Sequence, residues 1–206
     1  MKEEDIYSEL SSIRNLMERS SRFISLSGLS GVLAGVYALT GAFIAYRLVY
    51  KEDSGLRLRD FYANDPLVLW PLFAIAMVVL VLSVFTGVWL TIRQAKRKGE
   101  NYWNPVSKRL LANLCIPLFT GGLFILALIV RGEYDIIAPV SLIFYGLALV
   151  SGSQYTYSDV KFLGFLEIAL GLLAAITPGF GLIFWVIGFG FLHILYGAIM
   201  HFKYDK

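Results

Sequence analysis

Six long apolar stretches dominate the sequence and set the narrowest limits on its fold. A helix that crosses the hydrocarbon core of a membrane needs about 20 mostly apolar residues. The stretches of this kind are Ile24–Tyr46, Leu67–Ile92, Leu110–Val130, Ile136–Ser153, Val160–Thr177 and Leu182–Phe202. They lack the alternating polarity of a barrel strand, and a helix satisfies its own backbone hydrogen bonds in lipid. The sequence therefore predicts an all-α membrane protein with six transmembrane helices in three hairpins.

The composition excludes most soluble classes of protein. The chain of 206 residues is 57% hydrophobic and 16% charged, whereas a soluble domain carries about 25% charged residues. A water-soluble fold of this size could not bury so much apolar side chain. We therefore expect membrane lipids as partners and no nucleic acid. The single cysteine, Cys115, rules out an intramolecular disulfide.

Lysine and arginine predict the orientation, because cytoplasmic loops of membrane proteins are enriched in both. With the N-terminus inside, thirteen of the 18 positive residues fall on the cytoplasmic side and five on the outer side. The largest cytoplasmic group lies between the second and third stretches, in residues 93–109. We expect a multi-pass membrane protein with both termini in the cytoplasm.

Residues 1–22 form a separate cytoplasmic element before the transmembrane domain of residues 23–206. Ile6, Leu10, Ile13 and Met17 recur at helical spacing between charged residues, which predicts an amphipathic helix. Such a helix could lie on the membrane surface or on the cytoplasmic loops. It could also dock onto a protein partner or a second copy of the chain.

One acidic residue, Glu167, lies inside a predicted span, where a charged group costs several kcal/mol and usually has a partner or a function. The turn signal around Gly179 separates the last two spans. Glu167 precedes Gly179 by twelve residues and His193 follows it by fourteen. At about 1.5 Å per residue, both side chains lie roughly 20 Å from the turn. An antiparallel hairpin would therefore bring Glu167 and His193 to the same depth.

This pair has two interpretations. A Glu–His contact could satisfy two buried polar groups and fix helix packing, or it could exchange protons or bind a cation. Their predicted depth in the membrane is the reason to include three further residues in an intramembrane polar pocket: Asn113, Tyr145 and Tyr196. Tyr145 and Tyr196 precede glycines in a six-residue pattern shared by the second, fourth and sixth spans, which suggests an internal repeat.

Small residues mark one face of the first span. Ser27, Gly31 and Gly35 repeat every four residues, a pattern that lets helices approach closely in lipid. The stripe could pack inside the bundle or form a homodimer interface.

Motifs for catalysis and cofactors are absent from the sequence. It contains no Walker loop, HExxH, GxSxG or CxxC. His201 lies about 12 Å along the helix from His193, too far for both to bind one ion. We therefore predict no catalytic residue, metal site or cofactor, and we favour a non-enzymatic role without excluding a membrane-embedded enzyme.

Two segments carry a family resemblance. Residues 20–31 (SSRFISLSGLSG) and residues 181–197, including GLIFW and HILYG, resemble an uncharacterised family of small six-helix inner-membrane proteins of Bacteroidetes-type bacteria. The resemblance implies the fold but no activity or substrate. The leading functional hypothesis is a partner-binding or sensory membrane protein that acts through a homodimer or a cytoplasmic partner. The alternative is a small-solute or ion permease or channel with its polar pocket around Glu167 and His193.

Overall fold

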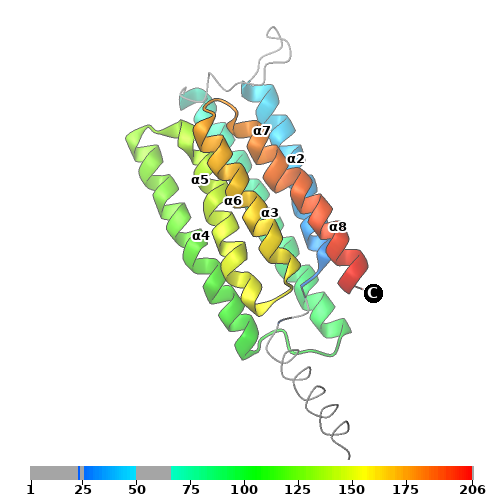
Figure 1. The fold of residues 1–206 in the computed structure, drawn as a ribbon. Coiled ribbons are helices and arrows are strands. Elements are labelled where there is room, and N and C mark those ends of the chain that lie inside the picture. Colours follow the sequence, from blue (N-terminus) through cyan, green and yellow to red (C-terminus); the bar gives the residue numbers. More distant parts are fainter. Residues whose placement is uncertain (1–22, 24–25, 50–65, 206) are drawn as a thin grey trace, which may run out of the picture.

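The computed structural model describes residues 23, 26–49 and 66–205, and the described part of the chain is helical without strands. Figure 1 shows a bundle of long helices that run side by side. The helices are α2 (Gly28–Val49), α3 (Pro66–Arg97), α4 (Pro105–Arg131), α5 (Ile137–Gly152), α6 (Asp159–Ile176), α7 (Gly181–Trp185) and α8 (His193–Tyr204). Two short 3-10 turns, η2 (Tyr134–Ile136) and η3 (Ser153–Tyr155), flank α5, and a π-helical segment, η4 (Val186–Leu192), joins α7 to α8.

Five of the described helical stretches are long and apolar enough to cross a membrane. They are Gly28–Leu48, Leu69–Arg97, Pro105–Arg131, Tyr134–Tyr155 and Gly181–Tyr204. The fifth predicted span corresponds to α6, which is helical but is not among these five. It carries three charged residues, Asp159, Lys161 and Glu167. The predicted amphipathic helix of residues 1–22 lies outside the described residues.

The helices follow a definite order of neighbours. α2 packs against α3 on one side and against α8 and η4 on the other, while α5 lies between α4 and α6. α2 thus packs on α3, and α4 packs on α5, the next helix along the chain in each case. α6 packs far more extensively on α5 than on the α7–α8 helix that follows it. α5 therefore has extensive contacts with both α4 and α6.

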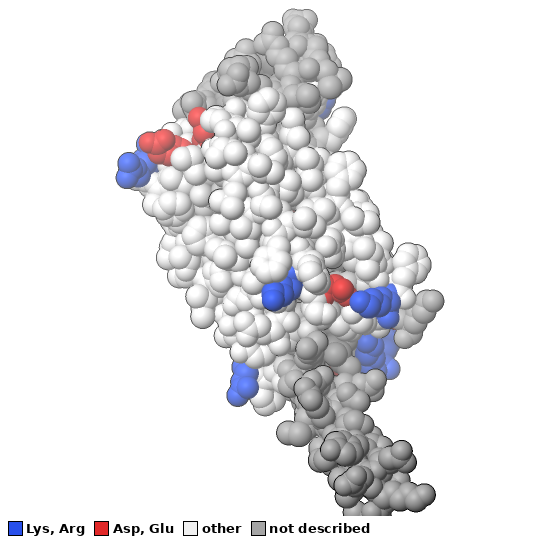
Figure 2. All heavy atoms as spheres, in the orientation of Figure 1, with Lys and Arg blue, Asp and Glu red and all other residues white. Residues whose placement is uncertain are grey.

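Exposed apolar side chains cover the middle of the bundle, and charged side chains lie toward its two ends on the face in Figure 2. Phe43, Phe85, Phe119 and Ile176 are each more than 60% exposed. Exposure of this kind is unfavourable in water but expected where lipid is the solvent. It agrees with helices that cross a membrane.

Local signals in the sequence set the start and end of α4. Asn104 accepts a hydrogen bond from the Ser107 backbone N–H at 2.8 Å, and the Ser107 hydroxyl lies 3.0 Å from the Asn104 backbone N–H. This reciprocal capping box satisfies two backbone donors, and Pro105 follows at a helical position that needs no donor. At the other end Gly132 adopts a left-handed conformation with φ of 76° and accommodates the sharp turn.

A close helix crossing joins α2 to α8 and its π-helical extension. A Cβ atom on Gly35 would lie 2.7 Å from the Gly190 carbonyl oxygen, and one on Gly197 would lie 2.5 Å from the Val32 backbone nitrogen. Such distances leave no room for a side chain. The small-residue stripe of Ser27, Gly31 and Gly35 thus faces α8 within the bundle. The homodimer interpretation of this stripe is therefore not supported.

The proposed repeat is uneven. Gly146 and Gly197 both lie in tight helix crossings, whereas a Cβ atom on Gly87, at the matching place in the second span, would meet nothing within 4 Å. The pattern therefore marks close packing in two of its three copies.

We predict that Gly197→Ala destabilises the bundle by about 1–3 kcal/mol, because its Cβ atom would overlap backbone atoms of α2. Gly122→Ala is the matched control, since a Cβ atom on Gly122 has open space around it. The thermal unfolding midpoint in detergent should fall for the first variant and should not fall for the second. Equal midpoints for Gly197→Ala and the wild type would contradict this packing.

Candidate functional site

Glu167 lies in the middle of α6 and is the most unusual side chain of the bundle. It has 0% of its surface exposed, and within the described part of the chain neither carboxyl oxygen has a hydrogen-bond partner. A buried polar group without a partner costs free energy, and a buried charge costs more. Such a group in a native fold therefore calls for a physical reason.

His193 lies beside this carboxyl group. Its Nδ1 atom lies 3.5 Å from Glu167 Oε1. The count of residues from Gly179 placed Glu167 and His193 at the same depth in the membrane. The structure brings these two side chains together. Both side chains are buried, and neither faces lipid.

The two nitrogens of the His193 ring have different partners. Nδ1 lies 2.9 Å from the Gly188 carbonyl oxygen, and Nε2 lies 2.6 Å from the Tyr145 hydroxyl. A carbonyl oxygen only accepts, so Nδ1 carries the proton that it donates to Gly188. In the neutral ring, Nε2 is then the acceptor for the hydroxyl of Tyr145.

The π-helical segment η4 creates the space for this arrangement. His193 follows directly after it, and Gly188 lies inside it. A Cβ atom on Gly188 would lie 2.5 Å from Glu167 Oε2 and 2.6 Å from a methyl carbon of Leu142. A larger residue here would have to displace the ends of the Glu167 and Leu142 side chains. π-Helical turns of this kind are frequent at functional sites. The carboxyl group occupies the volume that any other side chain at this position would need.

Aromatic rings surround the hydroxyl–imidazole pair. The ring centroids of Tyr145 and Phe189 are 5.0 Å apart, those of Tyr145 and His193 are 5.3 Å apart, and those of Trp185 and Phe189 are 5.2 Å apart. Contacts of this kind fix ring orientation. Phe189 thus packs against both Tyr145 and His193, whose ring centroid lies 5.9 Å from its own.

Chemically, the order of groups is that of a proton relay. An imidazole can accept a proton at one nitrogen while it releases the proton on the other. Here the hydroxyl of Tyr145 contacts Nε2, and the carboxyl group of Glu167 lies beside Nδ1. In the described arrangement the Nδ1 proton is donated to the Gly188 carbonyl oxygen, and Glu167 Oε1 lies 3.5 Å from Nδ1. Transfer to an ionised Glu167 therefore requires the Nδ1–H group to turn from Gly188 to the carboxylate while Nε2 accepts a proton in its place.

The structure does not join the other two predicted pocket residues to this group by any described hydrogen bond. Asn113 donates to the Arg109 carbonyl oxygen at 2.9 Å and accepts from the Ser151 hydroxyl at 3.3 Å, which links α4 to α5. Tyr196 packs against an apolar cluster that contains Leu149 and Met200. Depth along the membrane is not sufficient to predict contact, because side chains at one depth can point to different faces.

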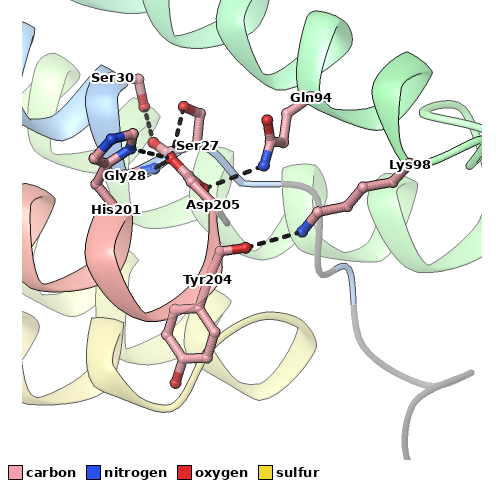
Figure 3. Close-up of polar contacts among 8 residues, drawn as sticks. All are labelled: Ser27, Gly28, Ser30, Gln94, Lys98, His201, Tyr204 and Asp205. Atoms are coloured by element: carbon pink, nitrogen blue, oxygen red, sulfur yellow. Dashed lines mark hydrogen bonds and ion pairs between the residues drawn. The ribbon is translucent and has the colours of Figure 1, made fainter.

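A second polar cluster, which the sequence did not reveal, centres on Asp205 (Figure 3). Its carboxylate accepts hydrogen bonds from the Gly28 backbone N–H at 2.9 Å, the Ser27 hydroxyl at 3.3 Å and the Gln94 amide at 3.3 Å. His201 Nδ1 contacts it at 2.9 Å. A helix N-terminus has free N–H groups and favours negative charge. Asp205, which follows α8, therefore caps the N-terminus of α2. Its hydrogen bonds also link α2, α3 and α8.

The end of α8 is also tied to the start of α6. Lys203 Nζ and the Tyr204 hydroxyl contact Asp159 Oδ2 at 2.9 Å and 2.7 Å. Burial alone would raise the pKa of Asp159, but these hydrogen bonds outweigh it and lower the pKa below its usual range. His201 belongs to the Asp205 cluster, and the described residues contain no group of three or more His, Cys, Asp and Glu side chains that could hold a metal ion.

Comparisons with known proteins add no further constraint, because no protein-family model, no curated protein and no solved structure matches the chain. The resemblance of residues 20–31 and 181–197 to small bacterial membrane proteins therefore stays a prediction.

We predict that Tyr145→Phe lowers the free energy of unfolding by about 1 kcal/mol, because it leaves His193 Nε2 buried without its donor. Tyr196→Phe is the matched control, since no described hydrogen bond involves its hydroxyl and it holds the equivalent place before a glycine. Denaturation in a graded series of detergent mixtures would compare the two. Equal losses in both variants would show that the Tyr145 hydroxyl has no special partner.

Proposed function

We propose that this chain is a multi-pass membrane protein that acts as an ion permease, and that the ion is a proton carried by Glu167. The observation that supports this most directly is the buried carboxyl group without a hydrogen-bond partner beside a histidine that is bonded to a tyrosine. Acidic and histidine side chains in succession form the proton paths of many membrane pumps and transporters.

The size of the site favours a proton over a larger ion. Gly188 and Leu142 fill the space next to Glu167 Oε2. A metal cation needs several oxygen or nitrogen ligands around it, and one carboxylate with one histidine is a poor set. A proton needs a single oxygen. It also removes the charge whose burial would otherwise be costly.

The topology that goes with this function is six crossings in three hairpins, with α6 as the fifth, in a bacterial inner membrane. Both termini would be cytoplasmic. This proposal rests on the excess of lysine and arginine assigned to the cytoplasmic side. The presence of Glu167 in α6 is compatible with a crossing because neighbouring helices shield it completely from lipid.

A partner-binding or sensory protein is the second candidate, and one contact favours it. The buried residue Phe23 donates from its backbone N–H to the Tyr155 carbonyl oxygen at 2.7 Å and accepts from the Thr156 hydroxyl at 2.9 Å. The chain just before α2 is therefore fixed to the connection between α5 and α6. A partner bound to residues 1–22 could therefore act on α5 and α6, the helices that carry Tyr145 and Glu167.

The permease is tested with purified protein in liposomes that contain a pH-sensitive dye, with potassium and valinomycin to compensate charge. A pH gradient should dissipate faster with the wild-type protein than in protein-free liposomes. Glu167→Gln keeps the shape of the side chain but cannot release a proton. We expect its proton flux to fall to the protein-free level.

Glu133→Gln is the matched control for this experiment, because Glu133 is exposed and lies in the connection between α4 and α5. It should conduct as the wild type does. Flux through the wild type no greater than in protein-free liposomes, or equal flux through Glu167→Gln, would refute the permease.

A further inference from the structure

The C-terminal end of α3 presents two faces with different surroundings. Gln94 and Ala95 are buried, and Gln94 bonds to Asp205. The opposite face is exposed and contains a hollow of about 420 Å³ lined by Trp89, Ile92, Arg93, Lys96 and Arg97. Three positive charges therefore gather on one side of this helix, away from the bundle.

These three charges have no acidic partner in the part of the chain that the structure describes. The described ion pairs involve other residues, whereas the guanidinium of Arg93 lies over the ring of Trp89 at 5.9 Å from its centroid. A cation–π contact of this kind holds the guanidinium in place without neutralising it. Arginine binds phosphate oxygens well because its planar fork can donate two parallel hydrogen bonds.

An apolar stripe continues from the hollow toward the middle of α3. Trp89 is 54% exposed, Phe85 68%, Val81 59% and Val78 58%. Residues three or four apart lie on the same side of a helix, so the stripe runs in line with Arg93 and Arg97. α3 packs mainly on α2, and its apolar middle has almost no buried residue. The outward stripe is therefore open to an acyl chain.

We propose that this surface is a binding site for an anionic phospholipid. The phosphate group contacts Arg93, Lys96 and Arg97 in the hollow, and the acyl chains lie along Trp89, Phe85 and Val81. Positive charge at the head-group level followed by an apolar stripe matches the order of charge and hydrocarbon in such a lipid. This site is separate from Glu167 and does not depend on the permease.

Native mass spectrometry of the full chain, stripped of lipid in mild detergent, tests the site. Phosphatidylglycerol should bind more tightly than phosphatidylcholine. Arg93→Gln with Arg97→Gln should weaken phosphatidylglycerol binding about tenfold or more, since each basic residue contributes separately to attraction by anionic lipid. Trp89→Ala keeps every charge and should also weaken binding, because it removes the contact that holds Arg93.

Lys108→Gln with Arg109→Gln is the matched control, because it removes the same charge from the start of α4, the next helix along the chain, and both residues lie outside the hollow. It should leave phosphatidylglycerol binding unchanged. Equal binding of the two lipids, or equal weakening by the control, would overturn the site and leave only a general attraction. Saturable binding of inorganic phosphate at the same affinity would overturn the lipid as the ligand.

Discussion

The contact between Glu167 and His193 is the constraint on which the centre of the structure depends. A carboxyl group that is wholly inside a membrane bundle must either find donors or carry a proton, because its charge cannot reach water. In this chain it meets one imidazole at 3.5 Å, and that imidazole already donates to Gly188. The surrounding helices therefore enclose a carboxyl group whose oxygens can still accept a hydrogen bond or a proton.

The close approach of α2 to α8 positions the π-helical segment η4, which contains Gly188. Gly35 of α2 lies against the π-helical segment η4, and Gly197 of α8 lies against α2. Both η4 and α8 are therefore packed closely on α2. The Asp205 cluster adds polar ties to α2 and α3 at the end of the same helix. With η4 fixed in this way, Gly188 faces Glu167, and His193 is held between Tyr145 and the carboxyl group.

Much of the architecture follows from the sequence because lipid imposes simple rules. Long apolar runs predict spanning helices, and the length of the chain between Gly179 and each polar residue predicts depth. The equal depth of Glu167 and His193 could be predicted for this reason, but the helix rotation that brings them to 3.5 Å could not. Glycine spacing in α2 also predicts a close helix contact, although not that α8 is the neighbour.

Other parts required information that a sequence pattern does not contain. Depth places Asn113 and Tyr196 near the pair, but the rotation of each helix sends them to other contacts. The π-helical turn places Gly188 against Glu167 of α6 and Leu142 of α5, a contact that no local sequence signal indicates. Asp205 follows the last span in a short charged tail, and its role as the cap of α2 arises from a contact between opposite ends of the chain.

The central claim is that Glu167 exchanges a proton. Infrared difference spectroscopy of the protein in lipid at stepped pH tests this claim most directly. The account predicts a pH-dependent carbonyl band from a protonated carboxyl group with weak hydrogen bonding. That band should disappear in Glu167→Gln and remain in Glu133→Gln. A difference spectrum that is identical in the wild type and in Glu167→Gln would contradict the account, because Glu167 would then hold one protonation state throughout.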